Sequence, residues 1–340
     1  MTDVIDRGPD DPRLALRILG EGFQVAQGIS VAARLGIADL LADGVRSSEE
    51  LAALASADPD ALYRLLRALA TVGVLAEEDG RRFSLTAIGD GLRTDAEGSL
   101  AGWLAFICSP PLWEAWGHLE HSVRTGANAF QHIHGEDVWT YRSKDPAASV
   151  MFDRAMASLS HQQRQAVAVY DFAPFATIAD IGGGTGSFLA RILTTVPDAR
   201  GILFDLPHVV AGAPAVLAAA GVEDRCEVVG GSFFDGVPAG ADAYVLRAVV
   251  HDWEDDDAVR IMDAVRHAIP DHGRILLVER VVDGPNEGRA AKWSDLNMLV
   301  SPGGRERTAV EYDDLLARAG FRPTRIVDGP MHSFVEGVPA

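Results

Sequence analysis

The sequence predicts an α/β protein, with an N-terminal all-α and winged-helix region followed by a C-terminal doubly wound sheet that is mostly parallel. The main observation is in the second half, where short apolar runs alternate with helical stretches, as in successive βαβ units. In the first half, two capped helical stretches precede a hairpin signal, as in a winged helix. Between these patterns, large apolar residues at helical spacing predict further helices.

Length, composition and charge limit the fold and the partners. The 340 residues suffice for two domains, or for one large α/β unit with a helical appendage. Apolar residues make up 48% of the chain and charged residues 23%, which is typical of a folded globular protein and argues against disorder, collagen and coiled-coil rods. With 30 basic and 49 acidic residues, the net charge of −19 repels phosphate backbones and anionic lipids. We therefore expect neither nucleic acid nor a membrane as a partner.

The cysteines and the N-terminus bear on the compartment. Cys108 and Cys226 are far apart and neither belongs to a CxxC pair, so neither a disulfide scaffold nor a zinc knuckle is predicted. The first residues contain no apolar signal core, and no stretch reaches the roughly 18 uncharged apolar residues of a membrane span. We expect a soluble, cytoplasmic protein.

The N-terminal elements begin with helical spacing over residues 14–41. Gly20, Gly28 and Gly36 interrupt this spacing and predict two or three short helices. Ser47 and Ser48 then predict the start of another helix, because hydroxyls before acidic residues are a typical N-cap signal.

A winged helix is completed by the next segment. Asp58 followed by proline predicts a helix over residues 59–71, and Asp79-Gly80 between two short apolar runs predicts a hairpin. Such a unit suggests DNA binding, but the presumed recognition helix offers only Arg64 and Arg67 as basic residues. We instead expect this unit to pack against another surface, most economically a second copy of itself.

The chain then divides further. Residues 102–170 are helical and rich in large aromatic residues, which are more often core than ligand contacts. We expect three segments: a helical and winged-helix domain over residues 1–100, linking helices over 101–170, and an α/β domain over 171–340.

The α/β domain is predicted from its apolar runs. The expected parallel strands are Thr177–Ile181, Gly201–Asp205, Cys226–Val229, Ala243–Leu246 and Ile275–Glu279. Phe321–Val327 and His332–Val335 predict a closing antiparallel pair near the edge.

A glycine loop follows the first of these strands and points to a nucleoside ligand. The string from Asp180 to Gly186 is D-x-G-x-G-x-G, and it lacks the third glycine of the dinucleotide fingerprint G-x-G-x-x-G. This spacing suits a nucleoside that carries an amino-acid chain, whose ammonium group Asp180 can help to hold. Asp205 ends the next strand, where a carboxylate can accept both hydroxyls of a ribose.

Further candidates follow the later strands. Phe233 could lie against an adenine face and Ser232 could bond its edge, although a turn with core aromatics explains this motif equally well. His251 lies beyond the carboxyl end of a central strand, where open sheets bind ligands, and it is our candidate base. Glu279 ends the neighbouring strand and can reach it, and Glu306 supplies a second acid on a turn.

No metal site is predicted. The run Asp255-Asp256-Asp257 invites a magnesium interpretation, but acidic residues at this position more often stabilise the first turn of the helix that follows.

Five motifs in order resemble one family, the class I S-adenosylmethionine-dependent O-methyltransferases of the caffeic-acid and bacterial natural-product type. The matching strings are Asp-Ile-Gly-Gly-Gly-Thr-Gly186, Asp205-Leu-Pro-His208, Gly-Gly-Ser-Phe-Phe234, His251-Asp-Trp253 and Gly-Gly-Arg-Glu-Arg-Thr308. The resemblance covers essentially the whole chain, because this family also carries an N-terminal helical and winged-helix dimerisation domain. It implies a homodimer, S-adenosylmethionine as cofactor, and a Rossmann-like methyltransferase sheet.

The resemblance also implies roles for individual residues. His251 would be the general base between Glu279 and Glu306, with Glu279 holding the imidazole tautomer. The residues expected to surround the cofactor are Asp180, Gly182, Gly184, Asp205, Leu206, Ser232, Phe233, Arg247 and Ser160. The residues expected to contact the substrate are Phe152 and Met156 on a helix that roofs the site, with Asp252, Asn297, Met298 and one or more of Trp103, Phe106 and Trp113 of either subunit.

Two positions depart from the family pattern. Plant members usually have aspartate where Ser232 stands and lysine where Arg247 stands. Serine keeps an acceptor without the charge, and arginine keeps the charge as a planar fork, so the affinity for the cofactor would differ while its identity would not.

The expected reaction is methylation of a small aromatic hydroxyl. A phenol with a pKa near ~10 gives up its proton more easily than an aliphatic alcohol near ~16. Three alternatives remain open at this point: a non-catalytic, ligand-sensing winged-helix regulator, a hydroxylase or decarboxylase of the same fold, and an NAD-dependent oxidoreductase, which the glycine spacing opposes.

Overall fold

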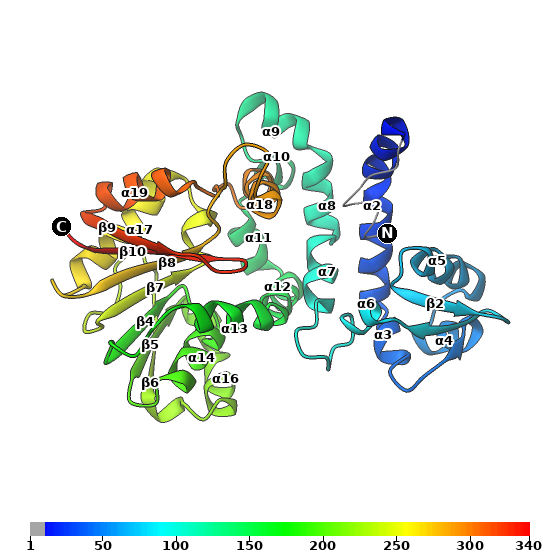
Figure 1. Ribbon diagram of the computed structural model, residues 1–340, viewed down its shortest axis with the longest axis horizontal. Coiled ribbons are helices and arrows are strands. Elements are labelled where there is room, and N and C mark those ends of the chain that lie inside the picture. The colour runs from blue at the N-terminus through cyan, green and yellow to red at the C-terminus, as the bar shows by residue number, and fades with distance from the viewer. Residues whose placement is uncertain (1–10) are drawn as a thin grey trace. The chain divides into compact units, whose positions relative to one another are not determined.

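The computed structural model describes residues 11–340, apart from the side chains of Ala157, Ser160, His161 and Gln162 (Figure 1). The chain forms two compact units, Met1–Trp113 with Arg142–His161, and Glu114–Tyr141 with Gln162–Ala340. Over residues 11–340, no helix combines the length and the apolar composition needed to cross a bilayer.

The first unit contains the predicted winged helix. Its elements are α2 (Pro12–Arg34), α3 (Ile37–Leu40), β1 (Arg46–Ser47), α4 (Ser48–Ala55), α5 (Pro59–Thr71), β2 (Leu75–Glu78), β3 (Arg82–Leu85), α6 (Ala87–Asp90), α7 (Ala101–Ile107) and α12 (Pro146–Ser158). Ser47 and Glu50 form a capping box at α4, and Asp58 caps α5 by accepting from the Ala61 amide. The strands make an antiparallel sheet in the order β1-β3-β2, which completes the wing.

The N-terminal helix differs from the prediction. Instead of short helices broken at Gly20 and Gly28, α2 runs through both glycines and ends before Gly36, which has a left-handed φ of 64°. A glycine inside a helix costs only about 1 kcal/mol relative to alanine, a penalty too small to end a helix of 23 residues. A Cβ at Gly28 would lie at an ordinary contact distance, 3.5 Å, from Leu65 and Leu69, so this part of α2 packs beside α5.

The second unit contains the doubly wound sheet. Its strands are β4 (Thr177–Ile181), β5 (Arg200–Asp205), β6 (Cys226–Gly230), β7 (Ala243–Arg247), β8 (Arg274–Glu279), β9 (Phe321–Val327) and β10 (Ser333–Pro339). Its helices are α9 (Leu119–Thr125), α10 (Ala129–His134), α14 (Ser187–Thr195), α15 (Pro207–Val210), α16 (Ala213–Ala219), α17 (Asp255–Ala268), α18 (Arg289–Val300) and α19 (Ala309–Arg318). The helices α8 (Pro110–Gly117), α11 (Val138–Lys144) and α13 (Ser160–Val169) contain the points where the chain passes between the units.

Helices cover both faces of this sheet (Figure 1). On one face, α17 and α19 pack on alternate strand residues such as Tyr244 and Leu277. On the other face, α14 and α16 pack on the intervening residues, such as Val245 and Leu276. Because both faces are buried, the central strands are continuously apolar, which is the pattern that the sequence showed.

The strand order is β6-β5-β4-β7-β8-β10-β9, and β10 runs opposite to the other strands, because it pairs antiparallel with both β8 and β9. The mostly parallel sheet and its antiparallel last strand confirm the predicted fold class. Along the chain, the order of strands reverses between β4 and β7. At such a switch point, the loops at the carboxyl ends of the strands diverge and leave a crevice for a ligand.

Candidate active site

The glycine loop lies at the carboxyl end of β4, beside the switch point. Gly182, Gly184 and Gly186 have left-handed φ values of 70°, 62° and 83°. A Cβ at Gly182 would lie 2.8 Å from Val249, whereas Gly184 has no atom within 4 Å of its Cβ position. The loop is therefore packed tightly at its start and open at Gly184, where a ligand can approach the backbone.

Asp205 at the end of β5 holds this loop. Its Oδ2 accepts from the Gly184 amide at 2.8 Å and its Oδ1 from the Leu206 amide at 2.6 Å. A carboxylate oxygen can accept more than one hydrogen bond, so these contacts are compatible with the predicted binding of ribose hydroxyls by Asp205. The side chain of Leu206, next to it, is 43% exposed.

Asp180 and Arg247 provide buried opposite charges at the neighbouring strand ends. Burial raises the pKa of Asp180 to about 7, an effect that Arg247 opposes and Asp205 reinforces. Burial also lowers the pKa of Arg247, whose guanidinium lies 5.2 Å from the centre of the Phe188 ring. Within the described residues, Asp180 Oδ2 and Arg247 Nε are buried without a hydrogen-bond partner. These unpartnered atoms suit the ammonium and carboxylate groups of a bound amino acid.

Ser232 and Phe233 follow β6, as predicted. The Ser232 hydroxyl accepts from the Phe234 amide at 3.3 Å, and the Phe233 ring meets Trp253 edge-on at 5.7 Å between ring centres. A Cβ at Gly182 would lie 3.9 Å from this ring, so Phe233 borders the glycine loop. Contact with an adenine remains a prediction for both residues.

His251 lies in a strained turn after β7. Ala248 has a φ of 51°, a left-handed conformation that alanine rarely adopts. Glu279, at the end of β8, stabilises this turn because its Oε1 accepts from the amides of Val249 at 3.0 Å and Val250 at 2.8 Å. One carboxylate thus fixes the backbone that presents His251.

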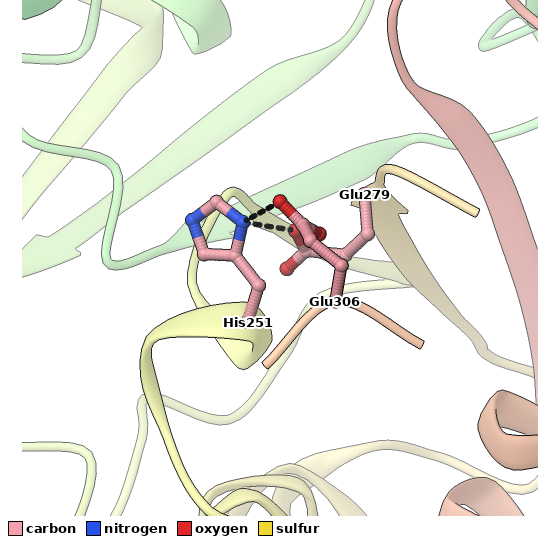
Figure 2. A group of neighbouring side chains, drawn as sticks. All are labelled: His251, Glu279 and Glu306. Atoms are coloured by element: carbon pink, nitrogen blue, oxygen red, sulfur yellow. Dashed lines mark hydrogen bonds and ion pairs between the residues drawn. The ribbon is translucent and has the colours of Figure 1, made fainter. Parts of the chain in front are cut away.

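The imidazole is held on one side by two buried carboxylates. Figure 2 shows Glu279 and Glu306 on the Nδ1 side of the ring and the other ring nitrogen on the far side. Nδ1 lies 3.0 Å from Glu306 Oε1 and 3.5 Å from Glu279 Oε2 (Figure 2). Glu306, rather than the expected Glu279, therefore makes the hydrogen bond that selects the tautomer, because Glu279 Oε1 is engaged by backbone amides.

These charges make His251 unusually basic. Burial by itself lowers the pKa of His251, but Glu279, Glu306 and Asp252 together raise it to about 10. Burial raises the pKa of Glu279 to about 7, and the neighbouring Glu306 adds to that rise. Burial works against ionisation of Glu306 too, yet His251 and the Ser294 hydroxyl hold its pKa below the ordinary value. The cluster therefore favours the charged imidazolium form of His251, with a proton on both ring nitrogens, at neutral pH.

Three of the predicted substrate residues, Asp252, Asn297 and Met298, lie on α18 or beside His251. Asn297 and Met298 lie on α18, whose Ser294 donates to Glu306 Oε1 at 2.7 Å, so this helix is in contact with the carboxylate that bonds His251. Asn297 accepts from the indole of Trp116 at 3.0 Å, and Met298 is buried. Asp252 Oδ1 lies 3.6 Å from Nε2 of His251.

The predicted roof helix is α12 of the first unit. Phe152 meets Phe106 edge-on at 5.5 Å, and the Arg142 guanidinium lies 4.1 Å from the Phe152 ring centre. Met156 is half-buried on the same helix. The side chain of Ser160 lies outside the described part of the chain. Substrate contact stays a prediction for Phe152 and Met156, as cofactor contact does for Ser160.

The acidic run after Trp253 lies in the first turn of α17, where it complements the helix dipole. Arg307, Arg318 and Arg260 pair with these acids at 2.7–2.8 Å. Among the side chains that the structure describes, only His251, Glu279 and Glu306 have donor atoms close enough together to ligate a metal, within 4.8 Å. A shared proton explains their spacing, and we assign no metal to them.

Sequence reasoning missed Gln163 on α13, which is 3% exposed. Its amide donates to the Ser187 hydroxyl at 3.0 Å, directly after the glycine loop, while its Oε1 is buried and unpartnered among the described atoms. The available signal was its position one helical turn after Ser160.

Comparison with known proteins identifies the family. Residues 116–322 match the O-methyltransferase domain, and residues 19–95 match the O-methyltransferase dimerisation domain. The chain belongs to the O-methyltransferase family. Both the resemblance seen in the sequence and the predicted fold are thereby confirmed.

Individual relatives of this O-methyltransferase differ in their acceptors. It is 43% identical over 307 residues to the phenazine O-methyltransferase PhzM of Lysobacter antibioticus, covering 90% of each chain. It is 42% identical over 304 residues to an 8-amino-8-demethylriboflavin N,N-dimethyltransferase of Streptomyces davaonensis, covering 88% of this chain and 87% of that protein. The solved structure of NcsB1 from neocarzinostatin biosynthesis, in complex with S-adenosylmethionine and 2-hydroxy-5-methyl naphthoic acid, superposes with a TM-score of 0.80 at 35% identity, covering 93% and 96% of the chains. This O-methyltransferase is thus an enzyme of the natural-product type and not a non-catalytic regulator.

Proposed function

We propose that this enzyme transfers a methyl group from S-adenosylmethionine to a phenolic hydroxyl of a small aromatic natural product, with His251 as the general base. The observation that carries this proposal is the buried imidazole whose Nδ1 is bonded to Glu306 at 3.0 Å beside Glu279. Such an arrangement fixes the ring and leaves its other nitrogen for a proton.

S-adenosylmethionine is the cofactor, and the chain offers groups for each of its parts. We assign Gly182, Gly184 and Asp205 to the nucleoside, and Asp180 and Arg247 to the charged amino-acid end. The residues proposed for the adenine are Leu206, Ser232 and Phe233. The bound cofactor supplies a methyl group on a positively charged sulfur, which keeps the electron pair of the S–C bond as the methyl leaves.

His251 accepts the proton of the substrate hydroxyl. The substrate oxygen forms its bond to the methyl carbon as its proton passes to Nε2 of His251. The two carboxylates stabilise the resulting imidazolium, and the hydrogen bond to Glu306 keeps Nδ1 protonated so that Nε2 is the accepting atom.

Proton transfer to His251 is easier from an aromatic hydroxyl than from an aliphatic one. Proton transfer from a phenol with pKa ~10 to an ordinary imidazole at ~6.5 is uphill by about 5 kcal/mol. With the pKa of His251 at about 10, that transfer is nearly balanced. An aliphatic alcohol near ~16 remains about 8 kcal/mol worse than a phenol.

We expect kcat/KM to rise with pH through neutrality. Below the raised pKa of His251, both ring nitrogens carry a proton and the ring cannot accept another. The fraction of enzyme with a neutral imidazole therefore grows about tenfold per pH unit. In Glu306→Gln, one of the carboxylates that raise this pKa is lost, so the rising limb moves to lower pH and the maximum rate falls. A pH–rate series on both proteins checks this. A flat profile between pH 6 and 9, or an unmoved limb in the variant, would contradict the role of His251.

We also propose that Gln163 binds the amino-acid end of the cofactor through its unpartnered Oε1. Gln163→Leu should raise the Kd for S-adenosylhomocysteine about tenfold, because a hydrogen bond to a charged group is worth about 1.5–3 kcal/mol. Gln165→Leu, on the same helix, is the matched control and should leave the Kd within about twofold. Titration calorimetry measures both, and equal constants would remove Gln163 from the site.

N-methylation is the second candidate, because the riboflavin relative carries an N,N-dimethyltransferase name. An aminophenol offered as acceptor distinguishes the two, since mass spectrometry counts the added methyl groups and NMR locates them. We expect the methyl on oxygen. A methyl found only on nitrogen would favour the alternative.

The acceptor site and the assembly complete the proposal. We propose Phe152, Met156, Asp252, Asn297 and Met298 as substrate contacts, and a homodimer assembled through the dimerisation domain. Within this proposal, residues 1–100 serve dimerisation, 101–170 link and roof the site, and 171–340 bind the cofactor and catalyse.

A further inference from the structure

We propose that Arg307 is a positioning residue, which fixes the turn that carries His251 by binding the carbonyl groups on both sides of it. This inference rests on the proposed role of His251. Arg307 itself is only 1% exposed.

The contacts of Arg307 engage its whole guanidinium group. Nη1 donates to the carbonyl oxygens of Val250 and Arg305, both at 3.2 Å. Nη2 donates to the carbonyl oxygen of Trp253 at 2.9 Å, and to Asp255 Oδ1 at 2.8 Å. Nε donates to the same Asp255 oxygen at 3.0 Å. The planar fork therefore joins the turn to the first residue of α17.

The position of these carbonyls relative to His251 gives the contacts their effect. Val250 directly precedes His251, and Trp253 follows it by two residues. With both carbonyls bound by one rigid group, the turn cannot rotate to carry the imidazole away from Glu306. Asp255 balances the buried positive charge, which would otherwise be costly.

The chain around Arg307 contacts the same turn in two other ways. Glu306, the preceding residue, bonds Nδ1 of the imidazole. Gly304 packs so closely on the peptides of His251 and Asp252 that a Cβ would overlap with them. The Arg307 backbone is in turn anchored, since its carbonyl accepts from the Val282 amide at 2.9 Å. Within the segment from Gly304 to Arg307, Glu306 thus contacts the imidazole, Gly304 packs on the peptides of the His251 turn, and Arg307 bonds the carbonyl groups of that turn.

Arg307→Met and Arg307→Lys test this role, with Arg318→Met as the matched control. Arg318 pairs with Asp255 and Asp256 at the start of α17 but, in the described part of the chain, donates no hydrogen bond to the His251 turn. We expect kcat to fall about 10- to 100-fold in Arg307→Met, because small misplacements of catalytic groups have effects of this size. Arg307→Lys keeps the positive charge but lacks the planar guanidinium, so its kcat should lie between those of Arg307→Met and the wild type. In all three, the Kd for S-adenosylhomocysteine should stay within about twofold.

Two further readouts separate positioning from a purely structural role. With labelled histidine, NMR reports the Nδ1 proton of His251 in the bond to Glu306, and we expect its resonance to shift in the Arg307 variants alone. The limb of kcat/KM assigned to His251 should also move toward neutral pH in these variants. If Arg307→Met does not fold, Arg307→Lys carries the test.

The proposal is overturned if the Arg307 variants lose no more kcat than Arg318→Met, or if they lose stability with the His251 resonance and pH limb unchanged. Failure of the base assignment would look different, because His251→Ala would then retain its activity whatever the Arg307 variants do.

Discussion

Replacing His251 with alanine should lower kcat by about 100-fold to 10,000-fold, the range over which a positioned base contributes. The loss arises because the substrate oxygen must attack before its proton has an acceptor. Binding of S-adenosylhomocysteine should remain within about twofold of the wild type, since the substitution replaces none of the residues that we propose to bind the cofactor. Turnover by mass spectrometry and binding by calorimetry give the two values.

The control for this variant is His267→Ala. His267 is also a histidine with an acidic neighbour, Asp263, but its side chain is 76% exposed on α17. It should keep full activity. If His251→Ala works within about threefold of the wild type, His251 is not the base.

Gly304→Ala should impair both stability and catalysis. The new Cβ would overlap with the carbonyl oxygen of His251 and with the peptide between Asp252 and Trp253. One of the two backbones must therefore move, and overpacking of this kind costs typically about 1–3 kcal/mol. Since one of these backbones carries His251 and the other carries Glu306, we expect a lower Tm together with a fall in kcat of about tenfold or more.

Gly284→Ala is the matched control, because no atom lies within 4 Å of its Cβ position. Thermal unfolding and turnover should both stay close to wild type there. A Gly304→Ala enzyme with unchanged Tm and kcat would show that the segment from Gly304 to Arg307 does not hold the catalytic turn.

The sheet was predictable because burial on both faces produces apolar runs that are visible without a structure. The predictions for Thr177–Ile181 and Phe321–Val327 match β4 and β9 at both ends, and the other strands of this sheet differ from prediction only at their ends. The length of α2 was not predictable from local propensity. Gly20 and Gly28 are weak helix residues, yet α2 continues through both of them.

The candidate site was predictable where a residue ends a strand. Asp205 and Glu279 are such residues, and the topology of a parallel sheet brings them to one edge. The sequence did not predict that Glu306 bonds the imidazole while Glu279 bonds the backbone amides of the turn. This difference depends on which carboxylate oxygens the amides already engage. The same holds for Arg307 and Gln163, whose roles follow from distances between atoms that are remote in sequence.

The most direct measurement of the general-base claim compares two acceptors of similar shape whose hydroxyls differ in pKa. One is an ordinary phenol, and the other is a halogenated analogue that is already ionised at the assay pH. An ionised oxygen needs no base, so His251→Ala should lose at least about 100-fold with the ordinary phenol and only a few-fold with the ionised one. Equal losses with both acceptors would contradict the account.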